Sequence, residues 1–97
     1  MKTKIANTSI PDFVDISTAV RIYWEKVDIG TAEIKKLFGV SKDKALRIKK
    51  AAQALQEDRG IPFRNLNFVS TAIAYEAWGF DITDLEKRLH KLKKLEA

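Results

Sequence analysis

The spacing of hydrophobic residues in the middle of the chain has the period of an α-helix. Ile34, Leu37 and Phe38 stand at i, i+3 and i+4, which places their side chains on one face of a helix. Gly39 follows, and glycine commonly ends a helix because it adopts the left-handed conformation at little cost. Ser41 is a good N-cap for a second helix. We expect that helix to span residues 42–57, with an inner face made of Ala45, Ile48, Ala52 and Leu55. The pattern therefore predicts two helices joined by a tight turn.

Helical spacing also occurs before and after this pair. Ser17 or Thr18 can cap a first helix, although the β-branched residues that follow also permit a strand. A fourth helix is predicted over residues 70–78, and a fifth begins with the capping-box pair Thr83 and Glu86. The apolar stripe of the first helix is predicted to contain Ile16, Val20, Tyr23, Trp24 and Val27. Together these segments predict a mainly α-helical domain of about five helices.

Segment 61–69 has two interpretations. Pro62 prevents a helix, and the apolar residues around it alternate as in a short two-stranded hairpin, or wing. Arg64 and Asn65 would then lie at the tip of the wing, within reach of a phosphate or the minor groove. An irregular loop is the alternative.

The length of the chain suits one small domain with short extensions. We expect residues 1–11 to form a loose arm, residues 12–80 the helical domain, and residues 81–97 a C-terminal amphipathic helix. No apolar run approaches the ~20 residues of a membrane span. The first residues lack the apolar core of a signal peptide, and the chain contains no cysteine. We therefore expect a cytoplasmic protein that has neither disulfides nor membrane contacts.

Charge is distributed unevenly along the chain. The net charge is +5, from 18 Lys and Arg residues against 13 Asp and Glu residues. Residues 41–50 carry five basic side chains and one acidic one, a net +4, whereas residues 5–33 carry two basic and five acidic ones, a net −3. A concentrated basic patch attracts phosphate backbones. A solvated, lysine-rich helix surface is the alternative.

Residues 31–50 resemble the helix-turn-helix of DNA-binding proteins. The resemblance is carried by Ile34, Phe38, Gly39, Val40, Ala45 and Ile48. Lys35 departs from the pattern, because the family usually has a small residue there. With the Pro-containing segment after SKDKALRIKKAAQAL, the organisation is similar to small winged helix-turn-helix proteins of bacterial mobile elements, including excisionase-like regulators. The resemblance implies a regulator that binds double-stranded DNA sequence-specifically. Two helices joined through a glycine also occur in plain helical bundles.

In such a protein the second helix lies in the major groove with its N-terminal half against the bases. Arg47 is the candidate for a guanine contact, and Leu46 could touch a thymine methyl or pack inside. Ser41 could donate to a phosphate as well as cap the helix. Lys44, Lys49 and Lys50 would mainly neutralise phosphates. The complete set of expected DNA-contacting residues is Ser41, Lys42, Asp43, Lys44, Leu46, Arg47, Lys49, Lys50, Arg64 and Asn65.

The sequence predicts no catalytic, metal or cofactor site. His90 is the one histidine, stands among lysines and is expected to face solvent. The pairs Asp12 with Asp15, and Asp81 with Asp84, flank expected helix starts, where aspartate caps backbone amides. The glycines are isolated, so no phosphate-binding loop is present. We expect neither an enzyme nor a small-molecule ligand.

The C-terminal helix carries an apolar stripe that a small domain would leave partly uncovered. The stripe consists of Ile82, Leu85, Leu89 and Leu92. We expect a homodimer with the helix over residues 83–95 in or near the interface. The main alternative to DNA binding is a small helical protein–protein interaction module, such as an adaptor, an antitoxin or a phage assembly part, that uses this leucine face.

Overall fold

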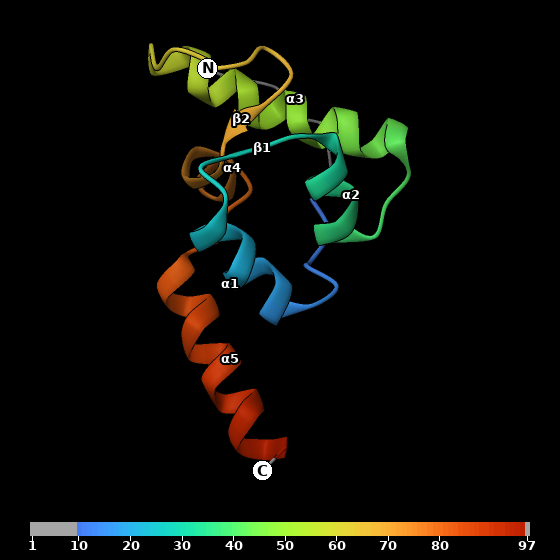
Figure 1. Ribbon diagram of the computed structural model, residues 1–97, viewed down its shortest axis with the longest axis vertical. Coiled ribbons are helices and arrows are strands. Elements are labelled where there is room, and N and C mark those ends of the chain that lie inside the picture. The colour runs from blue at the N-terminus through green and yellow to red at the C-terminus, as the bar shows by residue number, and fades with distance from the viewer. Residues whose placement is uncertain (1–9, 97) are drawn as a thin grey trace.

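Five helices and two short strands make up the described part of the chain, residues 10–96 of a computed structural model (Figure 1). In chain order they are α1 (Ile16–Glu25), β1 (Asp28–Ile29), α2 (Thr31–Phe38), α3 (Lys42–Asp58), β2 (Val69–Ser70), α4 (Thr71–Ala77) and α5 (Ile82–Glu96). The expectation of a mainly helical domain of five helices is confirmed, and the domain also contains one short antiparallel pair of strands. Of the arm expected over residues 1–11, residues 1–9 lie outside the described residues, and Ile10 packs against the core.

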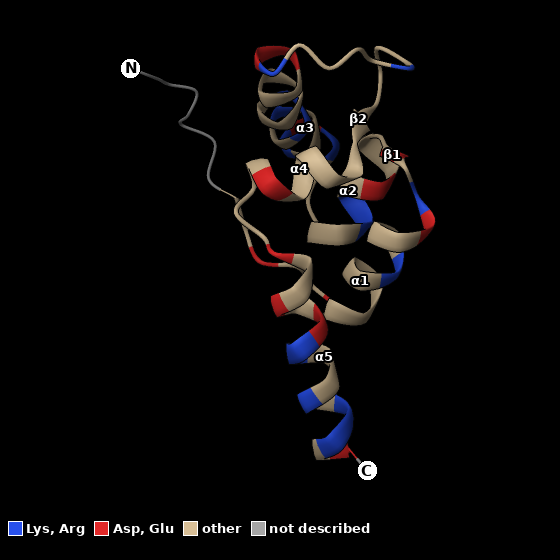
Figure 2. Cartoon of the chain, turned by 90° about the vertical axis from the view of Figure 1, so that its left-hand side faces the viewer, with Lys and Arg blue, Asp and Glu red and all other residues tan. Residues whose placement is uncertain are grey.

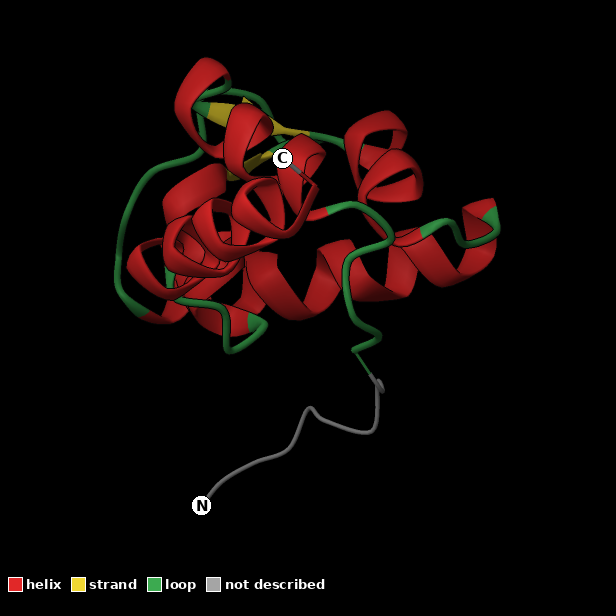
Figure 3. Cartoon of the chain, turned by 90° about the horizontal axis from the view of Figure 1, so that it is seen from below, coloured by secondary structure: helices red, strands yellow, loops and turns green. Residues whose placement is uncertain are grey.

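The two strands pair across a long stretch of sequence, and this decides between the two interpretations of segment 61–69. β1 runs antiparallel to β2, with Asp28 opposite Ser70 and Ile29 opposite Val69 (Figure 3). Residues 61–68 form an irregular loop, which we call the 61–68 loop. A wing would need two paired strands inside this segment. The partner of β2 is instead β1, which lies before α2.

The first helix differs from the expectation at both ends. Its N-cap is Asp15, whose carboxylate accepts hydrogen bonds from the Ser17 amide at 3.1 Å and the Thr18 hydroxyl at 2.8 Å. The helix ends at Glu25, so the predicted apolar stripe, which includes Val27, extends beyond the end of the helix. Trp24 is 64% exposed and Val27 is equally open to solvent, whereas the fully buried positions of α1 are Ala19 and Ile22.

The second and third helices form the expected helix-turn-helix pair. Ile34, Leu37 and Phe38 are buried, and Gly39 takes a left-handed conformation with φ of 64°. The Ser41 hydroxyl caps α3 by accepting from the Lys44 amide at 3.3 Å. The inner face of α3 is as expected, with Ala45, Ile48 and Ala52 fully buried and Leu55 half-buried. Lys35, which departs from the family pattern, points to solvent.

Two aromatic side chains, one in α4 and one directly after it, join the helices. The hydroxyl of Tyr75 donates to the carbonyl of Ala19 in α1 at 2.7 Å. The indole N–H of Trp78 donates to the carbonyl of Ile48 in α3 at 3.2 Å. Both rings are buried among other aromatic groups, so the Tyr75 bond holds α1 and the Trp78 bond holds α3 in the core.

The last helix begins in the core and ends outside it. Asp81, rather than the expected Thr83 and Glu86 box, caps α5 by accepting from the Thr83 amide at 2.8 Å. Leu85 is buried, and Glu86 accepts from the indole N–H of Trp24 at 3.0 Å. Beyond these contacts α5 extends away from the other helices along the 44 Å long axis (Figure 1). No helix of residues 10–96 has the length and apolar character needed to cross a membrane.

Candidate nucleic-acid interface

The N-terminal half of α3 presents cations to solvent. Lys42, Arg47 and Lys50 are exposed, and at about 100° per residue they lie within about 140° of one another around the helix axis. Asp43 and Ser41 are exposed beside them. These residues therefore form one accessible face at the start of a long helix, as the sequence predicted.

Two members of the expected set lie at the edge of this face. Lys44 and Leu46 are half-buried, and the backbone amide of Lys44 is engaged by the capping hydroxyl of Ser41. Part of the Leu46 side chain packs inside and part remains accessible.

Lys49 is not on the exposed face, and its expected role as a surface cation that neutralises phosphate is wrong. It is only 8% exposed. Its ammonium donates to the Thr31 hydroxyl at 3.1 Å and to the Asn67 carbonyl at 3.0 Å. Within residues 10–96 no carboxylate lies within ion-pair distance of it. Lys49 follows the fully buried Ile48, so it sits on the boundary of the inner face and ties α2, α3 and the 61–68 loop together.

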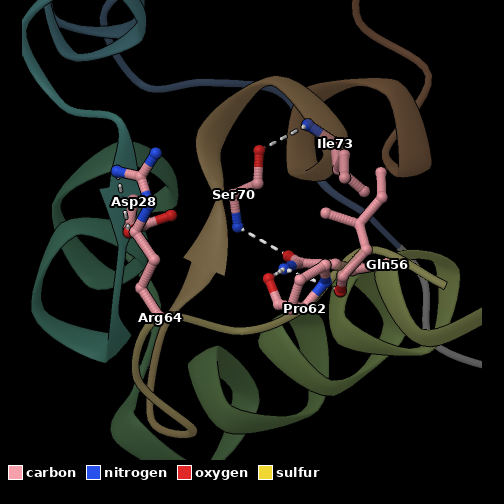
Figure 4. A network of polar contacts seen from close by, with 7 residues as sticks. Asp28, Gln56, Pro62, Arg64, Ser70 and Ile73 are labelled. Atoms are coloured by element: carbon pink, nitrogen blue, oxygen red, sulfur yellow. Dashed lines mark hydrogen bonds and ion pairs between the residues drawn. The ribbon is translucent and has the colours of Figure 1, made fainter. Parts of the chain in front are cut away.

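Glutamines of α3 hold the same loop. Gln53 donates to the carbonyls of Leu66 at 3.0 Å and Phe68 at 3.1 Å. The buried Gln56 donates to the carbonyls of Ile61 at 3.4 Å and Pro62 at 3.1 Å. Its side-chain oxygen accepts from the Ser70 amide at 2.8 Å, which joins the loop to β2 (Figure 4).

Neither Gln53 nor Gln56 has a role among the residues predicted from the sequence. The available signal was their spacing, because residues 49, 53 and 56 repeat at i, i+4 and i+7 along one side of the helix. Polar side chains at helical spacing next to an apolar face indicate that something polar packs there.

Arg64 and Asn65 both lie on the loop, but they have different surroundings. The guanidinium of Arg64 is exposed and lies 3.8 Å from the carboxylate of Asp28 in β1 (Figure 4). The side-chain oxygen of Asn65 accepts from the Asn67 amide at 2.9 Å, so this residue builds the turn. Arg64 remains accessible to an anion, while one polar group of Asn65 is committed to the loop itself.

The C-terminal end of α3 has a different electrostatic character. Glu57 and Asp58 are exposed there, and Arg59 forms an ion pair with Glu76 of α4. This hydrogen-bonded partner lowers the pKa of Glu76 and raises that of Arg59. Within α3 and the 61–68 loop, the positive charge available to a ligand therefore lies in the first half of the helix and at Arg64.

Basic residues also gather at the opposite end of the molecule. Residues 87–96 of α5 contain five Lys or Arg residues and one Glu (Figure 2). Of the expected oligomer interface, Leu85 is buried and Ile82 half-buried in the protein's own core, so they are not available to a partner. Leu89 is half-buried, and Leu92 is 42% exposed.

The residues considered for metal binding or acid–base chemistry have other surroundings in the described part of the chain. No group of three or more His, Asp or Glu side chains in residues 10–96 could hold a metal ion. Asp15 and Asp81 are engaged as the caps of α1 and α5, and His90 is exposed, as expected. No family model, no curated protein and no solved structure matches the chain.

Proposed function

We propose that this protein binds double-stranded DNA, with the N-terminal half of α3 in the major groove, and acts as a regulator of transcription or of a mobile element. The observation that carries the proposal is the shared exposure of Lys42, Arg47 and Lys50 directly after a helix-turn-helix corner. A regulator of this kind would act in the cytoplasm. It binds and carries out no catalysis.

The charge of the face and its position both support this role. A helix enters the major groove when its end and outer face project beyond the rest of the domain. α3 and the 61–68 loop together occupy one end of the long axis, and α5 occupies the other (Figure 2). DNA could therefore approach α3 without meeting the C-terminal helix.

The proposal predicts salt-dependent DNA binding. Four cations of α3 are available, Lys42, Lys44, Arg47 and Lys50, since Lys49 is buried. If each neutralises one phosphate, log K should fall with log salt concentration with a slope of about −3.6. Fluorescence anisotropy with a labelled 30-base-pair random duplex, titrated at several salt concentrations, measures this slope.

A charge-reversed variant provides the control. Lys42→Glu with Lys50→Glu should abolish binding while leaving the circular-dichroism spectrum unchanged, because both side chains are exposed. If the wild-type protein binds no duplex at low salt, the proposal is wrong.

A protein–protein interaction module is the second candidate, and one observation favours it. Leu92 and Leu95 are exposed on the part of α5 that extends from the domain. Exposed leucines at helical spacing can pair with an apolar face of another helix. A second copy of the chain is the partner we expect, and such a dimer is also compatible with DNA binding.

A further inference from the structure

The 61–68 loop presents one leucine to solvent from a backbone that is firmly held. The side chain of Leu66 is 81% exposed. Its own carbonyl and the two that follow, those of Asn67 and Phe68, accept hydrogen bonds from Lys49 and Gln53 of α3. The next backbone groups are bound within the turn, since the Phe68 amide donates to the Asn65 carbonyl at 3.0 Å. The exposure of Leu66 is thus built into the loop.

The surroundings of Leu66 suit an anionic ligand with an apolar interior. Residues 61–69 include Arg64 and two asparagines but no acidic residue. Gln53, whose side chain binds the Leu66 carbonyl, is three residues beyond Lys50, about 4.5 Å along the axis of α3. The backbone of Leu66 is therefore held by the side chain that follows the basic face along α3.

We infer that Leu66 is an apolar wedge that enters the minor groove of the same duplex, next to the major-groove segment bound by α3. This inference rests on the proposed function. The minor groove has apolar sugar walls between two phosphate strands, and proteins insert leucine there to open base steps and bend the helix. Arg64 would contact the phosphates at the rim of that groove. Because α3 holds the loop in advance, little conformational freedom is lost on binding.

The first measurement separates an apolar contact from a charge contact. Leu66→Ala should weaken binding roughly tenfold, as expected for a leucine that loses most of its burial. The slope of log K against log salt should stay that of the wild type, because no cation is removed. Arg64 adds one phosphate contact to the four of α3, which makes the expected wild-type slope about −4.5, and Arg64→Ala should return it to about −3.6. Leu66→Met, which keeps an apolar side chain of similar volume, should restore affinity.

Leu95→Ala is the matched control, since Leu95 is 82% exposed but lies at the opposite end of the molecule. It should bind DNA like the wild type when the protein is kept at nanomolar concentration. Energy transfer between dyes at the two duplex ends should show bending by the wild type and by Leu66→Met, and less bending by Leu66→Ala.

The outcomes distinguish this inference from the proposed function. If the wild type binds DNA with the expected salt slope and Leu66→Ala binds and bends equally well, the wedge is wrong and the DNA-binding proposal stands. If Leu66→Ala changes the salt slope, the substitution has displaced the loop and the wedge is again wrong. If the wild type binds no duplex, the proposed function fails and the wedge fails with it.

Discussion

The hydroxyl of Tyr75 lies inside the core and makes the stability of the protein sensitive to alkali. Burial raises the pKa of this phenol well above its usual value, and the neighbouring Tyr23 adds to the shift. A raised pKa in the folded state favours the neutral phenol there. The stabilisation is therefore fully present below the unfolded-state pKa of about 10 and is lost as the pH rises toward the folded-state pKa.

We predict that the free energy of unfolding falls above pH 10, by up to about 1.4 kcal/mol per pH unit from this one group. Urea denaturation between pH 8 and pH 11 measures the loss. Tyr75→Phe removes the bond to the Ala19 carbonyl and should cost about 1 kcal/mol at pH 7. The same variant should depend less steeply on pH above 10, and an equally steep loss would contradict the assignment.

Arg47 and Lys50 are both exposed on α3 and should respond differently to truncation. Arginine can bind a guanine with two hydrogen bonds, whereas lysine acts chiefly as a point charge toward phosphate. Arg47→Ala should cost roughly 1–3 kcal/mol at a selected site and broaden the sequence preference. Lys50→Ala should weaken all duplexes nearly equally. Equal, sequence-independent losses from both variants would mean that Arg47 only positions the backbone.

The helices and turns that depend on residues close together in the sequence could be predicted. The corner between α2 and α3 depends on Gly39, Ser41 and an apolar spacing that repeats every three or four residues, and all three features are local. The exposure of the basic face followed from the same periodicity. Counting charge by segment rather than by helix face, however, included Lys49, which is buried.

The features that sequence reasoning missed depend on distant partners. β2 pairs with β1, about forty residues earlier, so no local hairpin pattern could predict this sheet. The 61–68 loop takes its shape from side chains of α3, and the exposure of Trp24 reflects the end of α1 at Glu25. Caps were misplaced by a few residues because several neighbouring side chains could each have served.

Substitution of Gln56 tests whether its side chain holds the 61–68 loop and β2 against α3. Gln56→Ala leaves the Ser70 amide and the carbonyls of Ile61 and Pro62 without this partner. We predict a loss of about 1–3 kcal/mol in the free energy of unfolding, because a buried amide group is involved. Amide hydrogen exchange at Ser70 should become faster. Gln53→Ala should leave Ser70 exchange slow, and unchanged exchange in Gln56→Ala would show that β1 alone protects the amide.

At the scale of the whole molecule, two basic surfaces lie at opposite ends of a 44 Å long axis. Residues 41–50 and residues 87–96 each carry a net charge of +4, although the chain as a whole carries only +5 (Figure 2). Because Lys49 is buried, the surface of residues 41–50 presents a net charge of +3. The two ends differ in what accompanies the charge. α3 places its apolar residues inside, whereas the end of α5 exposes Leu92 and Leu95 beside its lysines. Attraction of phosphate and association of copies can therefore be tested separately.

The last prediction concerns a homodimer formed through the exposed leucines of α5. Two copies would bring two ends of net charge +4 together, so salt should strengthen association by screening the repulsion, in the opposite sense to DNA binding. Analytical ultracentrifugation at tens of micromolar should show more dimer at 0.5 M than at 0.05 M salt.

Leu92→Lys should remain folded, because this position is already 42% exposed, and should stay monomeric at both salt concentrations. Leu66→Lys, at the other end, should dimerise like the wild type. A wild-type protein that is monomeric at both salt concentrations would mean that α5 ends in solvent and that any DNA site is bound by single copies.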